Sequence, residues 1–278
     1  MNKPLPEIRP GRSAVKAFRK YWYIFIIQFL NSLAYPGELL GRSLLIVPFM
    51  WIFSQLWRVT FAASGGSAIN GLTLADTLWY LMMAETLELS RPRFGNTIAD
   101  AVKDGSIAYV LNKPYDFLLY QFSLAMGEAV LRAGMNVILG SLMIWLMVGP
   151  PAAPIGFLVV LPAVLGAWML NYFVAVMIGL AAFVTEDVSA FQWIFQKFSF
   201  ILGGLLIPLD FYPPWLQTIA RALPFSSMIY GPSRLFVTPT AENFLNTLAT
   251  QGIWIAFLGL LTLWVYRRGV AALTVNGG

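Results

Sequence analysis

Long apolar runs with few charges are the feature of this sequence that most limits how the chain can fold. Such runs recur six times along the 278 residues. A helix of about 20 apolar residues spans the hydrocarbon core of a bilayer. Only 11% of the residues are charged, against about 25% in a soluble domain. The core of an aqueous domain cannot take up this much apolar surface, so we expect the bilayer to be the main solvent.

Six segments are predicted to cross the membrane, which makes the chain an all-α polytopic membrane protein. They are Gly37–Phe61, Leu72–Leu89, Phe117–Val148, Ile155–Val184, Ala190–Ile207 and Ile253–Tyr266. The third is longer than the hydrocarbon core requires, so it begins in water or tilts. For the sixth we leave open a start near Phe244.

A further helix is predicted to lie in the cytoplasmic interface ahead of the spans. Ser13–Tyr35 carries aromatic residues at three- and four-residue spacing on one face, with polar residues opposite. Its apolar part is short and contains Gln28 and Asn31, and Pro36 ends it, so it fits the membrane surface better than a span. Residues 1–36 thus form an N-terminal segment with an interfacial helix, and residues 37–278 form the six-span domain.

The distribution of basic residues tests this count. With six spans and a cytoplasmic N-terminus, fourteen of the 18 Lys and Arg residues lie inside, and only Arg58, Arg221 and Arg234 lie outside. If Ser13–Tyr35 also crossed, the loops would exchange sides and the basic residues would be divided almost equally. Only the six-span topology follows the positive-inside rule. The basic residues are thus divided between the two sides of the membrane and are not gathered into one patch, which also argues against a nucleic-acid-binding protein.

One stretch, Ile207–Pro239, is apolar and aromatic but is interrupted by six prolines. Each piece between prolines is too short to cross the membrane. Irregular backbone at membrane depth has to be shielded by protein or line a wet cavity. We therefore predict a re-entrant pair of short helices in the outer leaflet, before the last span.

Several catalytic classes are excluded by what the sequence lacks. There is no His and no Cys, so the commonest metal ligands and the usual general base are missing. None of the six lysines follows a glycine, so there is no phosphate-binding Gly-Lys-Ser/Thr loop. We expect no enzyme activity, metal or cofactor on this chain.

The loop Arg91–Pro114 contains a short amphipathic pattern. Ile98, Ala101 and Val102 alternate with Asp100, Lys103 and Asp104, and Gly105 can end the helix. A short, half-apolar, exposed helix needs either a protein partner or the lipid surface to cover it. We favour a protein partner over the lipid surface.

Of the charged residues within the predicted spans, Glu85, Glu88, Glu128 and Arg132 need a separate account. Glu128 and Arg132 can pair at i and i+4, and Glu85 or Glu88 could reach Arg132 across the bundle. Charges at membrane depth have to be paired or hydrated. Two interpretations remain open: the acids face a path for cationic substrates, or they form a structural ion-pair network.

Two motifs resemble ABC transporter permeases of the type-2 exporter class. The first is Ile98-x(6)-Gly105-x-Ile107-x(3)-Leu111-x-Lys113-Pro114 in the cytoplasmic loop. The second is Gly203-Gly204-x(3)-Pro208-x(4)-Pro213-x(2)-Leu216-x(2)-Ile219-x(3)-Leu223-Pro224-Phe225. The order of interfacial helix, spans and re-entrant segment fits this class along the whole chain, and the nearest likeness is to viologen- or drug-exporter-like bacterial permeases.

The resemblance implies a division of labour between subunits in a bacterial inner membrane. A separate ATPase dimer would bind ATP and Mg²⁺, and a second permease chain, different from this one or identical to it, would complete the translocation path. The coupling residues would be Asn96, Ile98, Asp100, Asp104, Gly105, Ile107 and Leu111. The path would be lined by Leu39–Phe61, Leu72–Leu89 and Ala190–Ile207, with the re-entrant segment closing its outer end. An ion-gradient-driven carrier or channel that uses the intramembrane acids is the rival interpretation.

Overall fold

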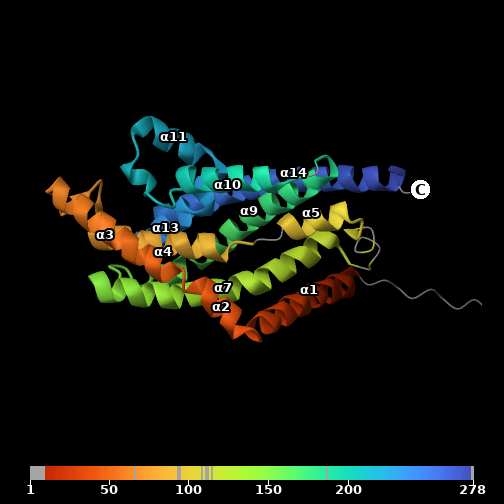
Figure 1. Ribbon diagram of the computed structural model, residues 1–278, viewed down its shortest axis with the longest axis horizontal. Helices are drawn as coiled ribbons and strands as arrows, with labels where there is room; N and C mark the ends of the chain where they lie inside the picture. The colour runs from red at the N-terminus through yellow and green to blue at the C-terminus, as the bar shows by residue number, and fades with distance from the viewer. Residues whose placement is uncertain are drawn as a thin grey trace, which may run out of the picture.

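The computed structural model describes residues 10–65, 67–92, 95–107, 109, 113, 115–185 and 187–276. These residues are mostly helical, and the longer helices run along the long axis of the molecule (Figure 1). Four helical segments are long and apolar enough to cross a membrane: Pro36–Ser64, Phe117–Val148, Gly156–Phe183 and Ala241–Gly269. The chain thus has the helical, membrane-spanning character that its composition predicts.

The first predicted span is two helices in succession. α2 (Pro36–Ser43) and α3 (Ile46–Ser64) are separated by a turn at Leu44 and Leu45. The break follows from Pro48, which has no N–H to donate to the carbonyl of Leu44. Ahead of them, α1 (Pro10–Leu33) packs along α7 (Phe117–Val148).

A two-residue β-hairpin leads from α3 into the centre of the bundle. Strands β1 (Ala68–Ile69) and β2 (Leu72–Thr73) pair through Asn70 and Gly71, which have positive φ angles of 47° and 81°. The hairpin is the one β element in the described part of the chain. Thr73 and Asp76 then form a capping box that starts α4 (Leu74–Ser90).

Helix α4 is the central helix of the fold. Every residue from Thr77 to Glu88 is buried, and α3, α7 and α13 pack around it. The sequence analysis placed this segment on the wall of the translocation path, and the structure corrects that placement. In this conformation α4 is covered by helices of its own chain.

Besides α7, four α-helices are described between Gly95 and Leu202. α5 (Gly95–Lys103) precedes α7, and α8 (Gly156–Val159) continues into α9 (Leu161–Leu180) after a break at Val160, because Pro162 cannot donate to the carbonyl of Leu158. A 3-10 turn, η1 (Ala181–Phe183), follows α9. α10 (Ser189–Leu202) is only 14 residues long.

The proline-rich stretch contains three short helices where a pair was predicted. After the 3-10 turn η2 (Leu209–Phe211) come α11 (Pro214–Ala222), α12 (Pro224–Met228) and α13 (Tyr230–Val237). α11 and α12 each begin with proline, whose missing N–H costs nothing in the first turn of a helix. The last helix, α14 (Ala241–Asn276), begins earlier than Ile253 and near the alternative start at Phe244.

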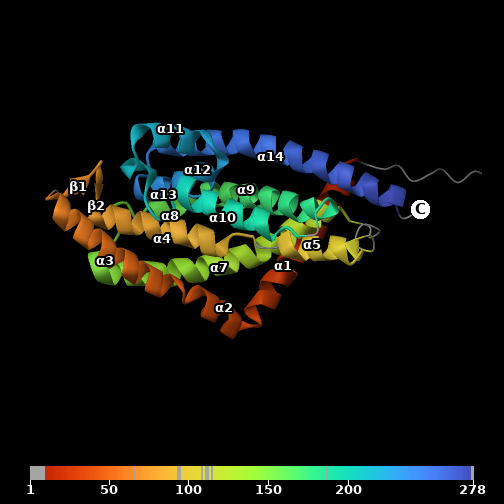
Figure 2. The same ribbon diagram turned by 45° about the horizontal axis from the view of Figure 1, so that its top comes forward.

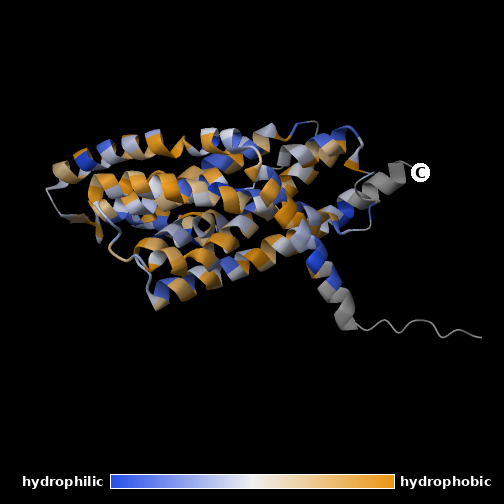
Figure 3. Ribbon diagram, turned by 90° about the horizontal axis from the view of Figure 1, so that it is seen from below, coloured by the Kyte–Doolittle hydropathy of each residue, from blue (hydrophilic) through white to orange (hydrophobic). Residues whose placement is uncertain are grey.

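The loop helix and the proline-rich segment lie at opposite ends of the bundle. Both views place α5 toward the end where the C-terminus lies, and α11 near the other end (Figures 1 and 2). Hydrophobic residues occur along most of the bundle between them (Figure 3). With 17 and 14 residues, α4 and α10 fall outside the four long apolar segments, so the count of six spans stays a prediction.

Candidate functional site

The apolar side of α5 is covered by the chain itself. Ile98 and Ile107 are 1% and 0% exposed, and they belong to one cluster with Val176 and Leu180. The sequence analysis expected an outside partner to cover this stripe. The structure shows instead that α9 and η1 cover it, which leaves only the other side of α5 for a partner.

The fit between α5 and α9 is close because glycines face it from both helices. A Cβ at Gly179 would lie 2.7 Å from the Cβ of Ile98 and 3.0 Å from the carbonyl oxygen of Gly95. A Cβ at Gly95 would lie 3.2 Å from the carbonyl oxygen of Ala175. Small residues of this kind let helix backbones approach each other closely. The backbones of α5 and α9 are therefore in close contact.

The opposite side of α5 is polar and faces solvent. Asp100, Lys103 and Asp104 are exposed, and Gly105, with a φ of 74°, ends the helix as predicted. The N–H of Ser106 donates a hydrogen bond of 2.9 Å to Asp104, which closes the turn and lowers the pKa of that carboxyl. This face offers a partner charges and hydrogen bonds in place of an apolar surface.

The end of α5 also contacts the start of α10 electrostatically. Hydrogen bonds from the hydroxyl and the N–H of Ser189 lower the pKa of Asp187, and Lys103 lowers it further. A hollow of about 220 Å³ lies between the two helices and is lined in part by Gly95, Arg91 and Gln192. Of the predicted coupling residues, Leu111 and the side chain of Asn96 lie outside the described residues.

Three of the four residues Glu85, Glu88, Glu128 and Arg132 form ion pairs. Glu128 and Arg132 pair at 2.7 Å, as their spacing predicts, and Glu88 pairs with Arg91 at 3.1 Å. Glu85 and Glu88 are 4% and 5% exposed, because both lie in the central helix α4. A contact of either with Arg132 stays a prediction. The burial of these acids favours the structural interpretation over a place on the substrate path.

A basic residue lies instead on the outward face of α10. Lys197, which the sequence analysis counted with the cytoplasmic side, is in the middle of this helix and is exposed. Its ammonium lies 5.3 Å from the ring centre of Trp193 and 5.5 Å from that of Phe200. A lysine at membrane depth is normally directed into a bundle or a water-filled cavity. Lys197 is directed away from its own bundle.

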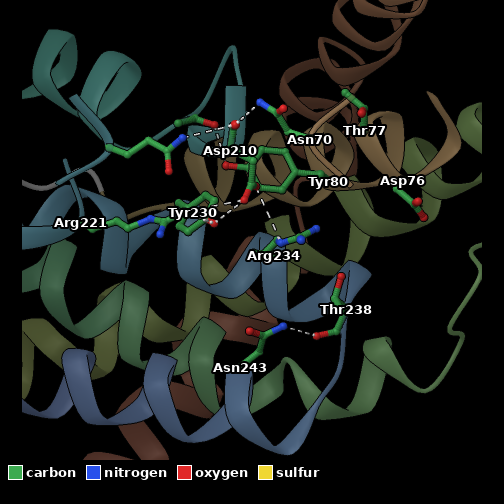
Figure 4. A network of polar contacts seen from close by, with 12 residues as sticks. Asn70, Asp76, Thr77, Tyr80, Asp210, Arg221, Tyr230, Arg234, Thr238 and Asn243 are labelled. Carbon is green, nitrogen blue, oxygen red and sulfur yellow. Dashed lines mark hydrogen bonds and ion pairs between the residues drawn. The ribbon is translucent and has the colours of Figure 1, made fainter. Parts of the chain in front are cut away.

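At the other end of the bundle, Asp210 joins the proline-rich segment to its neighbours (Figure 4). Its carboxylate accepts a hydrogen bond of 3.0 Å from the Tyr230 hydroxyl and lies 3.8 Å from Arg221 and 3.7 Å from Arg234. Its backbone carbonyl accepts a hydrogen bond of 2.7 Å from the Asn70 amide. One residue thus holds α11, α13 and the β-hairpin together.

The predicted glycines and prolines shape the entry into this segment. Gly204 has a φ of 74°, and its carbonyl accepts a hydrogen bond of 2.8 Å from the Tyr80 hydroxyl. A Cβ at Gly203 would lie 3.2 Å from the carbonyl oxygen of Phe225, so the two backbones approach closely here. The remaining predicted residues precede or open the short helices: Pro208 precedes η2, Pro213 precedes α11, and Pro224 opens α12.

Beside Asp210 lies a hollow of about 410 Å³ between α13 and α14. It is lined by charged, amide and hydroxyl side chains, among them Arg221, Arg234, Glu242, Asn243 and Thr250. Among the described residues, no cluster of three or more His, Cys, Asp and Glu could hold a metal ion.

The sequence analysis missed Asp210, Tyr230 and the hairpin. Asn70-Gly71 is a strong hairpin signal, so this element could have been predicted. No short-range pattern marks Asp210, since Asn70, which donates to its carbonyl, is 140 positions away. Such a contact emerges only once the chain is folded.

Comparison with known proteins gives one match. The model of a family described as ABC-2 family transporter protein matches residues 24–277. The matched range contains α5, α10, the proline-rich segment and all four long apolar segments. No curated protein matches the chain.

Proposed function

Because the chain belongs to the ABC-2 transporter family, and is thus a membrane transport subunit without an ATPase domain, we propose that it is the permease of an ATP-driven exporter. In this proposal the chain forms half of the translocation path and couples to a separate ATPase subunit. ATP and Mg²⁺ bind to that partner. The family implies an ABC ATPase partner in general, and export is the direction that fits the predicted class.

The exposed face of α5 is the proposed coupling surface. Asp100, Asp104 and Gly105 present it, while Ile98 and Ile107 hold it in place from behind. Closure of an ATPase dimer pushes on α5, and the close contact with Gly179 passes the movement to α9. Ile98 and Ile107 therefore act as positioning residues rather than contacts to the ATPase.

The exposed lysine of α10 is the observation that carries the proposal of a shared path. Lys197 and the aromatic residues Phe191 and Trp193 are exposed on this one helix. Such a face suits a water-filled translocation path that is completed by a second permease chain, identical or different. In this arrangement α10 and α3 line the path, and α4 supports them from behind.

The membrane topology of the proposal has six spans, with α4 and α10 as the two shorter ones. Short spans are accommodated by local thinning of the bilayer or by assembly with another chain. In this proposal both termini are cytoplasmic, which the positive-inside distribution supports, and the membrane is a bacterial inner membrane. The re-entrant segment around Asp210 closes the outer end of the path.

Reconstitution into vesicles tests this function. The purified chain alone should show no ATPase activity, and the complex with its ATPase should move substrate only with ATP. Asp100→Lys, on the exposed face of α5, should weaken the complex, while Glu242→Lys, at the opposite end, should not. If both variants bind the ATPase equally and transport normally, the assignment of the coupling surface to α5 is wrong.

A second candidate function, an ion-gradient-driven carrier or channel, is favoured by Glu85. This acid is 4% exposed, and within the described residues no ion pair joins it. Under this alternative, a proton or sodium gradient drives transport without an ATPase, and Glu85→Gln abolishes it. Under the ATP-driven proposal, Glu85→Gln leaves the dependence on ATP unchanged.

A further inference from the structure

A polar hollow lies where α1, α2 and α7 meet, away from α10 and the proposed path. Its volume is about 310 Å³, and it adjoins a second hollow of about 140 Å³, with Arg42 and Arg132 lining both. The larger is at the lower end of the range for small-molecule pockets, ~300–1,000 Å³. Gln28, Glu38 and Glu128 also line it.

The hollow is at the depth of lipid headgroups. α7 has 32 residues, whereas the hydrocarbon core needs about 20. Counting back about 20 residues from Val148, the end of α7, places the hydrocarbon boundary near Glu128. The interfacial helix α1 contacts α7 at this depth, since a Cβ at Gly127 of α7 would lie 2.7 Å from the carbonyl oxygen of Phe25 in α1.

Charges of both signs line this hollow in equal number. Arg42 pairs with Glu38 at 2.7 Å, and Arg132 pairs with Glu128 at 2.7 Å. Arg132 is only 5% exposed, although it lies at the edge of the bilayer. A purely anionic or purely cationic ligand would suit only half of these groups. A ligand with both charges suits all four.

The smaller hollow adds a hydrogen-bond acceptor that needs a donor. Asn136 is 1% exposed and lines this hollow together with Arg42 and Arg132. Within the part of the chain that the structure describes, its Oδ1 atom has no hydrogen-bond partner. Buried acceptors in proteins nearly always have a donor, from protein, water or a ligand. An N–H group on the ligand would supply it.

We propose that these joined hollows bind the headgroup of a zwitterionic phospholipid that carries a primary ammonium. The phosphate lies between Arg42 and Arg132, which line both hollows, and the ammonium lies in the smaller hollow and donates to Oδ1 of Asn136. The acyl chains run along Leu44 and Leu45, each 52% exposed, toward the bilayer centre. The site goes beyond the transport function, because it fixes the interfacial helix to the bundle through a lipid.

Native mass spectrometry of the full chain in detergent tests the site. The protein is supplied with equal amounts of phosphatidylethanolamine, phosphatidylcholine and phosphatidylglycerol with the same acyl chains. The quaternary ammonium of phosphatidylcholine has no N–H, and phosphatidylglycerol has no cationic group. We expect phosphatidylethanolamine to be retained about tenfold more than phosphatidylcholine, the effect of losing one charge-assisted hydrogen bond.

Two variants and a control assign the preference to this hollow. Asn136→Leu should remove the preference for phosphatidylethanolamine, and Arg42→Gln should lower the retention of all three lipids. Arg58→Gln, at the other end of the same span, should change nothing. Equal retention of the three lipids, no retention of any, or an unchanged preference in Asn136→Leu would each overturn the proposal.

Discussion

The two ends of the bundle are built on different physical principles. At the α5 end, Ile98 and Gly179 make an apolar contact so close that no side chain fits between the helices. At the end with the proline-rich segment, Asp210 holds the chain through a hydrogen bond of 3.0 Å and two loose ion pairs of 3.7 and 3.8 Å. Apolar packing dominates one end, and polar contacts dominate the other.

This difference indicates how the two ends respond to force. Closely packed interfaces move as a unit, because protein interiors resist compression. Ion pairs at distances near 4 Å with an exposed partner such as Arg221 are weak and exchange readily with water. We therefore expect the α5 end to transmit movement from the ATPase. We expect the Asp210 end to open and close as the outer gate of the path.

The largest effect is expected for Gly179→Val, which tests whether close packing transmits force. The new side chain would overlap Ile98 and displace α5, at about 3 kcal/mol of unfolding free energy. ATP-driven transport should fall at least tenfold relative to wild type. Gly134→Val on α7 is the matched control, since a Cβ there meets nothing within 4 Å. Normal transport by Gly179→Val would show that the contact between α5 and α9 does not transmit movement.

A smaller effect is expected for Asp210→Asn, which weakens the polar end. The variant loses the charge that attracts Arg221 and Arg234 through two loose ion pairs, so the free energy of unfolding should fall by about 1 kcal/mol. Denaturation followed by tryptophan fluorescence measures this change. Glu242→Gln is the control acid beside the same hollow. We also expect substrate to leak through Asp210→Asn without ATP. If the variant does not leak and is as stable as wild type, the Asp210 end is not a gate.

Gly105→Ala should act through the backbone alone. A Cβ at this position meets nothing within 4 Å, but the φ of 74° is unfavourable for alanine by about 1 kcal/mol. The turn after α5 should loosen, so hydrolysis by the ATPase continues while less substrate moves per ATP. The ratio of transport to hydrolysis measures this. An unchanged ratio would mean that the turn is not part of the coupling surface.

The smallest effect separates the two roles of Asn70. Asn70→Gly keeps the positive φ and loses only the hydrogen bond to Asp210, so it should cost about 0.5 kcal/mol. Asn70→Ala loses both and should cost more, in the same fluorescence-monitored denaturation. Equal stability of the two variants would show that the hydrogen bond, rather than the turn, matters here.

The sequence predicts what depends on local pattern and leaves out what depends on distant packing. Apolar length places the helices, and Gly105 ends α5 as its residue type predicts. The breaks at Leu44 and Val160 follow from Pro48 and Pro162 and are equally local. The coverage of Ile98 by α9 and the central place of α4 depend on segments far apart in the chain, so no short pattern reveals them.

Among the candidate sites, the same distinction applies. The Glu128–Arg132 pair was predictable because i and i+4 positions adjoin on a helix. The burial of Glu85 inside its own bundle and the outward direction of Lys197 were not, since both depend on which helices surround α4 and α10. The glycine pair Gly203-Gly204 was recognised from its residue type, although its contact with Tyr80 was not.

Site-directed crosslinking tests the central claim most directly. The chain has no cysteine, so Thr97→Cys on the exposed side of α5 carries a single reactive group for a photoactivated crosslinker. In the assembled transporter it should crosslink to the ATPase subunit, with a yield that changes when ATP is added, while Glu242→Cys at the other end should not. If Thr97→Cys reaches no ATPase, or does so no better than Glu242→Cys, α5 is not the site at which ATP drives this permease.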